Sequence, residues 1–97
     1  MNKEGVLSLL ASRREDIIVR FGVKKLSVFG SAARDDMRSG SDVDILVEFQ
    51  GAATFDRYMD LKAYLETILG TSVDLVTEDA VKPRMRSVIE KDIVRVA

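Results

Sequence analysis

Two aspartates with one residue between them, Asp42 and Asp44, stand at the head of an apolar run. Polar and apolar residues alternate through 42–49, which is the pattern of a β-strand. Side chains two residues apart on a strand point to the same face, so both carboxylates should project side by side. Two ionised carboxylates ~6–7 Å apart repel by about 2–3 kcal/mol at an effective dielectric constant of about 20. The pair therefore requires a compensating positive charge.

Only oxygen ligands are available to supply a metal site here, because the chain contains no histidine and no cysteine. Oxygen ligands favour a hard divalent cation, most often Mg²⁺ held beside substrate phosphates. A Gly-Ser pair, Gly30 and Ser31, precedes Asp42 and is separated from it by ten residues. Glycine lets the backbone approach a ligand, and a serine that opens a helix presents N–H and hydroxyl donors to phosphate oxygens. The pattern predicts a phosphate cradle that faces a two-carboxylate metal site.

Gly30-Ser31, ten residues, then Asp42-Val43-Asp44 resembles the G-S-x10-D-x-D signature of the DNA-polymerase-beta-like nucleotidyltransferases. Over nearly its full length the chain is similar to the minimal nucleotidyltransferase (MNT) branch, the antitoxins of MNT/HEPN toxin–antitoxin pairs. That family commonly carries F-G-S-x-A-R-G. The matching positions here are Phe29, Gly30, Ser31, Ala33 and Arg34. Asp35 occupies the place where glycine is common, so we expect the flexibility of this turn to differ.

The resemblance implies a third metal ligand and a set of nucleotide contacts. Asp74 lies mid-strand between two apolar residues, where an unpaired buried carboxylate would be costly; in the family such an aspartate completes the catalytic triad, and the alternative is an exposed strand face. Nucleotide binding is expected at Gly30, Ser31, Arg34 and Ser41, with Arg34 on the phosphates or on a closing carboxylate. Two Mg²⁺ ions would be held by Asp42, Asp44 and Asp74.

By the same resemblance, ATP is the donor and a tyrosine hydroxyl of a cognate HEPN ribonuclease toxin is the acceptor. AMP added there would silence the toxin. Two alternatives remain open at this point. The protein could be a small-molecule nucleotidyltransferase of the aminoglycoside type, or a non-catalytic antitoxin that neutralises the toxin by binding alone.

The elements that must position these residues can be read from periodicity and from turn residues. We expect helices over 4–21 with a stop at Gly22, over 31–37 opened by Ser31, from Thr54 to 69 ended by Gly70, and over 84–91 after Pro83. Strands are expected over 25–29, 42–49 and 72–76, with a short apolar segment after 92. Alternating helices and strands predict an α/β fold, a small mixed sheet with helices packed on it.

Composition limits the class of protein. With 97 residues, 46% hydrophobic and 32% charged, we expect one globular domain over 1–97. A net charge of −1 argues against direct nucleic-acid binding. No segment resembles a signal peptide or a membrane span, so a cytoplasmic protein without membrane contact is expected. A basic cluster follows Asp74 and comprises Lys82, Arg84 and Arg86. We interpret it as a solvated helix face, and the alternative is a contact with the triphosphate or with an acidic partner.

Overall fold

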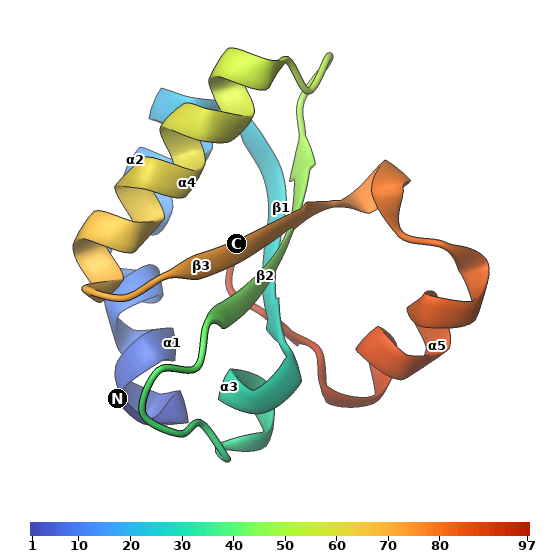
Figure 1. The fold of residues 1–97 in the computed structure, drawn as a ribbon. Helices are drawn as coiled ribbons and strands as arrows, with labels where there is room; N and C mark the ends of the chain where they lie inside the picture. Colours follow the sequence, from blue (N-terminus) through green and yellow to red (C-terminus); the bar gives the residue numbers. More distant parts are fainter.

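The computed structural model describes residues 1–97 as five α-helices and one four-stranded sheet (Figure 1). The helices are α1 (Lys3–Ser12), α2 (Arg14–Phe21), α3 (Gly30–Arg34), α4 (Phe55–Leu69) and α5 (Pro83–Asp92). The strands are β1 (Val23–Phe29), β2 (Val43–Phe49), β3 (Val73–Thr77) and β4 (Val94–Arg95), and a short 3-10 turn η1 spans Glu78–Ala80. The predicted α/β class is confirmed.

The sheet is mixed, with the strand order β3-β2-β1-β4. β1 pairs antiparallel with both β2 and β4, whereas β2 and β3 run parallel. Parallel neighbours need a long crossover, and α4 provides it between β2 and β3. This connection returns the chain to the same edge of the sheet, so the first residues of β2 and of β3 lie side by side.

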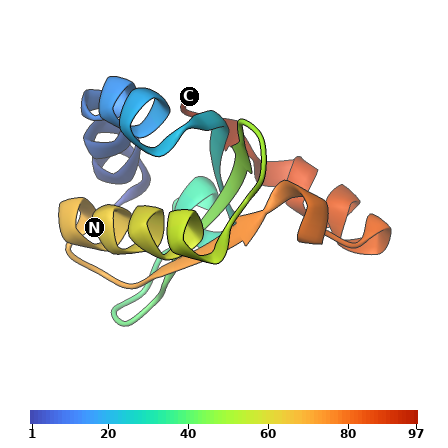
Figure 2. The same cartoon turned by 90° about the horizontal axis from the view of Figure 1, so that it is seen from above.

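Helices cover the two faces of the sheet unequally. Helices α1, α2 and α4 form a layer on one face, and α5 alone projects from the other side (Figure 2). Every second residue of β2 points into the first layer and is buried, namely Val43, Ile45, Val47 and Phe49. The residues between them point to the sparsely covered face, where Asp44 is half-buried. Strand alternation thus places the acidic side chains on the open side of the sheet.

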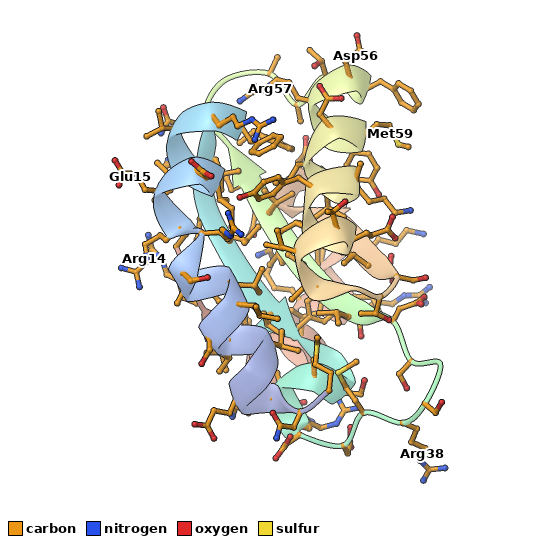
Figure 3. The ribbon with its side chains drawn as sticks, turned by 90° about the vertical axis from the view of Figure 1, so that its left-hand side faces the viewer. Arg14, Glu15, Arg38, Asp56, Arg57 and Met59 are labelled. Carbon is orange, nitrogen blue, oxygen red and sulfur yellow. The ribbon has the colours of Figure 1, made fainter.

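Arg57 fixes the end of the sheet farthest from the loop that carries Arg38 (Figure 3). Its guanidinium donates to the carbonyl oxygens of Gly22 and Gln50, each at 2.9 Å, and also to the carbonyl of Ala52. The same group lies 4.8 Å from the centre of the Phe49 ring. One side chain of α4 therefore binds the start of β1 to the end of β2, a role that the sequence did not indicate.

The single helix predicted over 4–21 is wrong, because the chain breaks at Arg13 into α1 and α2. Arg13 has φ −112° and ψ 12°, outside the helical range. The buried residues Val6, Leu10 and Ile17 keep a helical spacing across the break, so periodicity alone could not reveal it. Gly22 ends α2 in the left-handed conformation, as predicted.

Ser31 does not open its helix, contrary to the prediction. α3 begins one residue earlier, at Gly30, and the capping position falls on Phe29, without a side-chain hydrogen bond. The helix also ends at Arg34 instead of 37, because Asp35 adopts a left-handed φ of 61°. The other predicted ends hold: the Thr54 hydroxyl accepts from the Arg57 amide, Gly70 ends α4, and Pro83 starts α5.

None of the helices combines the length and the apolar character needed to cross a lipid bilayer.

Candidate active site

Asp44 and Asp74 occupy paired positions on neighbouring parallel strands. Paired residues of a sheet point to the same face, so both carboxyl groups project from the open face. Asp74 is close enough to Asp44 to raise the pKa of the Asp44 carboxyl. The structure thus brings Asp74 to the carboxylates predicted from the D-x-D pattern.

The electrostatics of Asp44 reflect this crowding. Burial raises the pKa of its carboxyl above the ordinary value, and the negative charges of Asp74 and then Asp42 raise it further. The positive charge of Arg34 partly opposes these effects. The group therefore carries negative charge that the chain itself does not fully neutralise, and a bound cation would neutralise it.

Gly30 touches Asp44 directly. It has a positive φ of 69°, and a Cβ built on it would lie 3.0 Å from Cγ of Asp44 and would collide with Oδ2. No other residue type fits this place without moving the carboxylate. The Gly-Ser bend and the aspartate pair are therefore parts of one site.

Asp42 and Ser41 lie on the loop that leads into β2. Asp42 is exposed and precedes the strand, and its charge acts on Asp44. The Ser41 hydroxyl accepts a hydrogen bond from the Arg38 amide at 3.1 Å, and the Ser41 amide donates to the Arg38 carbonyl at 3.0 Å. In this structure Ser41 holds the loop that delivers Asp42 to the site.

Arg34, at the end of α3, is bound by two carboxylates. Its Nε lies 3.2 Å from Oδ2 of Asp36, and its Nη1 lies 3.3 Å from Oδ2 of Asp92 on α5. The hydrogen bonds to Asp36 and then to Asp92 raise the pKa of the guanidinium. Because its charge also reaches Asp44, the arginine stands at the margin of the acidic site and ties α3 to α5.

The partners of Arg34 were missed in the sequence. Asp36 follows it by two residues within a turn, which is a weak local signal. Asp92 is 58 positions away, and nothing local connects it to α3.

In the basic cluster, Arg86 pairs with Glu78 at 2.7 Å, whereas Lys82 and Arg84 are exposed. This agrees with the interpretation of the cluster as a solvated helix face.

The donor set fits a divalent cation by its chemistry, since it offers only carboxylate oxygens and Asp44 carries excess negative charge. As the side chains stand, however, no three acidic groups converge in the manner of a metal centre. Asp44 and Asp74 form the close pair, and Asp42 is the outer member.

The fold and this site define a class of enzyme. The chain belongs to the nucleotidyltransferase domain family, whose pattern matches residues 9–96. Within that family it is a minimal nucleotidyltransferase: it is 36% identical over 93 residues to the protein adenylyltransferase MntA of Thermococcus cleftensis, covering 96% of this chain and 94% of that protein. The predicted resemblance is confirmed, and the protein is an enzyme of this family.

Solved structures agree with this assignment. A chain assigned to the minimal nucleotidyltransferases matches with a TM-score of 0.77 at 36% identity, covering 97% of this chain and 95% of that chain. More distant matches share the fold. One is the MNT antitoxin in complex with a tri-AMPylated HEPN toxin of Shewanella oneidensis, with a TM-score of 0.68 at 16% identity, covering 94% and 71% of the two chains. Another is a toxin–antitoxin structure with AMP-PNP, with a TM-score of 0.71 at 21% identity, covering 100% and 73%.

Proposed function

We propose that this protein transfers AMP from ATP to a tyrosine hydroxyl of a cognate HEPN ribonuclease toxin and thereby acts as its antitoxin. The observation that carries the proposal is the contact of Gly30 with Asp44 beside the paired Asp74. A glycine bend against clustered carboxylates suits a triphosphate and its cation, and a mere binding surface has no use for such repulsion. Identity to a protein adenylyltransferase supports protein as the acceptor.

Asp42, Asp44 and Asp74 would hold Mg²⁺, which when bound supplies neutralising charge to the triphosphate and lowers the pKa of the acceptor hydroxyl. Gly30 and Ser31 bind phosphate oxygens through backbone N–H groups and the serine hydroxyl. Asp74, exposed at the rim of the site, accepts a hydrogen bond from the incoming hydroxyl and orients it toward the α-phosphorus.

The reaction forms a phosphorus–oxygen bond and an O–H bond, and it breaks one bond of each kind. The tyrosine hydroxyl gives its proton to the Asp74 carboxylate as its oxygen bonds to the α-phosphorus. The bond from that phosphorus to the bridging oxygen breaks, and pyrophosphate leaves with the electron pair. Arg34, which is bonded to Asp36 and Asp92 in the free protein, would exchange a carboxylate partner for phosphate and neutralise the charge that develops on the leaving group. Positioning and charge neutralisation supply most of the rate enhancement in such transfers.

The test combines the purified protein, ATP and Mg²⁺ with the HEPN toxin encoded beside it. Intact-mass spectrometry of the toxin should show added masses that are multiples of AMP, and an Asp42→Ala/Asp44→Ala variant should add none. A toxin mass that stays unchanged with active wild-type protein would contradict the proposal. Full neutralisation by the double variant at stoichiometric dose would instead identify an antitoxin that acts by binding, and modification of aminoglycosides without toxin would identify a small-molecule enzyme.

A further inference from the structure

Asp35 has an unusual backbone conformation at the end of α3. It is the only residue other than glycine with a positive φ, 61°. Left-handed backbone is disfavoured for residues that carry a Cβ, although Asp and Asn tolerate it better than most. A residue kept in such a conformation needs compensating contacts from the rest of the fold.

The backbone around Asp35 forms a Schellman motif. The Asp36 amide donates to the Ser31 carbonyl at 2.9 Å, and the Asp35 amide donates to the Ala32 carbonyl at 3.3 Å. This pattern needs a left-handed residue just past the helix. The turn at Asp35 is thus bonded directly to Ser31, the residue expected to bind phosphate.

The Asp35 side chain joins this turn to α1. Its Oδ1 accepts a hydrogen bond from the backbone amide of Lys3 at 2.8 Å. That amide belongs to the first turn of α1, where four N–H groups lack partners within the helix and where negative charge is favoured. Asn2 caps the same helix end locally, accepting from the Gly5 amide at 2.8 Å. Two side chains therefore cap α1, and one of them comes from α3.

A helix of five residues cannot hold its own position. α3 packs on the core through two buried alanines, Ala32 and Ala33. Side chains at its C-terminal end also connect it to neighbouring helices. Arg34 reaches α5 through Asp92, and Asp35 reaches α1 through Lys3. Functional groups must be held within about 0.5 Å of their productive positions, so a tether on α3 controls the geometry of Gly30 and Ser31.

We propose that Asp35 is a positioning residue that fixes the Gly30–Ser31 bend by anchoring α3 to the N-terminus of α1. Its importance for catalysis rests on the proposed function, whereas its effect on the order of α3 does not. Compared with glycine, aspartate at this position has a more strained positive φ, but it gains a charged hydrogen bond to α1. The strain and the hydrogen bond have opposite effects on the free energy of unfolding, so aspartate and glycine at this position should give similar stability. Only aspartate holds α3 in a fixed position.

Three variants separate positioning from stability. Asp35→Gly keeps the left-handed turn without strain but loses the bond to Lys3. Asp35→Asn keeps an acceptor and tolerates the same φ. Asn2→Ala is the matched control, because it removes the other cap of α1 without touching α3. The readouts are amide hydrogen exchange at Asp36 and its neighbours, the KM for ATP with the HEPN toxin as acceptor, and the melting temperature.

Asp35→Gly should speed amide exchange in α3 and raise the KM for ATP about tenfold, because ATP would then have to order a bend that the bond to Lys3 no longer holds. Its melting temperature should change little. Asp35→Asn should restore both the exchange rate and KM, and Asn2→Ala should lower the melting temperature with KM unchanged. Wild-type exchange and wild-type KM in Asp35→Gly would overturn the inference. If the wild-type protein transfers no AMP, the proposed function fails, and the exchange measurement still decides the role of Asp35.

Discussion

Oδ2 of Asp44 occupies the space that a side chain at Gly30 would fill. This contact joins a turn and a strand that are ten residues apart in the motif, and it explains why the turn requires glycine. Glycine is required for its lack of a side chain as well as for its positive φ, since even a methyl group at Gly30 would collide with the Asp44 carboxylate and displace it. Three predictions below concern this contact and the charges around it, and a fourth concerns Arg57 at the other end of the sheet.

Gly30→Ala should abolish nucleotidyl transfer and destabilise the fold. Gly70→Ala is its matched control, because Gly70 has the same φ of 69° and nothing within 4 Å of the new Cβ. The control should lose about 1 kcal/mol of unfolding free energy from left-handed strain alone and keep its activity. Urea denaturation and transfer assays on both variants measure the difference. If Gly30→Ala and Gly70→Ala lose equal stability and keep equal activity, the Gly30–Asp44 contact does not contribute to function.

Asp44→Asn should stabilise the protein at neutral pH in the presence of a chelator while removing activity. Burial and the neighbouring carboxylates raise the folded-state pKa of Asp44, so the folded protein resists its ionisation more than the unfolded chain does. Wild-type stability therefore falls as pH rises from the ordinary aspartate value of about 3.9 through the higher folded value. The variant lacks this loss and should melt a few degrees higher at neutral pH.

At a pH well below about 3.9 the Asp44 carboxyl is protonated in both the folded and the unfolded state, so the stability difference should disappear. Melting curves of both proteins from acid to neutral pH test this. Adding Mg²⁺ with ATP should raise the wild-type melting temperature and leave that of Asp44→Asn unchanged, because a ligand stabilises only the form that binds it. A variant that is less stable than wild type at neutral pH would contradict the charge repulsion inferred at this site.

Arg34→Ala should raise the KM for ATP, by about tenfold, because it removes a cation whose charge reaches Asp44 at the proposed nucleotide site. The fold should change little, since the Arg34 side chain is 47% exposed and exposed ion pairs contribute little to stability. Asp92→Asn serves as the comparison variant, because it removes the ion-pair partner of Arg34 on α5 and leaves the arginine itself in place. Steady-state kinetics with ATP as the varied substrate measure both. A KM for Arg34→Ala equal to that of wild type would exclude the arginine from nucleotide binding.

Arg57→Ala should destabilise the protein by about 2–4 kcal/mol with no change in the KM for ATP. The guanidinium donates to several backbone carbonyls and lies over Phe49, so its loss removes charge-assisted hydrogen bonds between β1, β2 and α4 and uncovers the Phe49 ring. Arg14→Ala, at an exposed position on α2 (Figure 3), should change stability by no more than about 0.5 kcal/mol. Chemical denaturation of the two variants gives the comparison, and a small loss at Arg57 would refute its structural role.

The sequence predicted features that depend on short-range interactions and missed those that depend on contacts between distant segments. The strand carrying Asp44 and the α4 cap at Thr54 follow from local alternation and local hydrogen bonding, and both were predicted. The break at Arg13 was hidden because the apolar spacing continues through it. Asp92 beside Arg34 and Lys3 beside Asp35 are contacts between distant segments, which no local pattern encodes.

The candidate site shows the same division. The D-x-D pair and the Gly-Ser bend were predicted from their spacing, whereas the position of Asp74 beside Asp44 came from family resemblance and is visible only once β2 and β3 pair in parallel. Ser31 was expected as a cap and lies instead inside the first turn of α3. The catalytic and metal-binding roles of these residues stay predictions, as do nucleotide binding by Ser41 and the cytoplasmic location.

The most direct test determines which phosphate of ATP is transferred to the toxin. The protein is incubated with Mg²⁺, its HEPN toxin, and ATP labelled either at the α-phosphate or at the γ-phosphate, with Asp44→Asn in parallel. Nucleotidyl transfer at the Gly30–Asp44–Asp74 site predicts that the α-label alone appears on the toxin, and only with the wild-type protein. Appearance of the γ-label on the toxin, or equal α-labelling by Asp44→Asn, would contradict it.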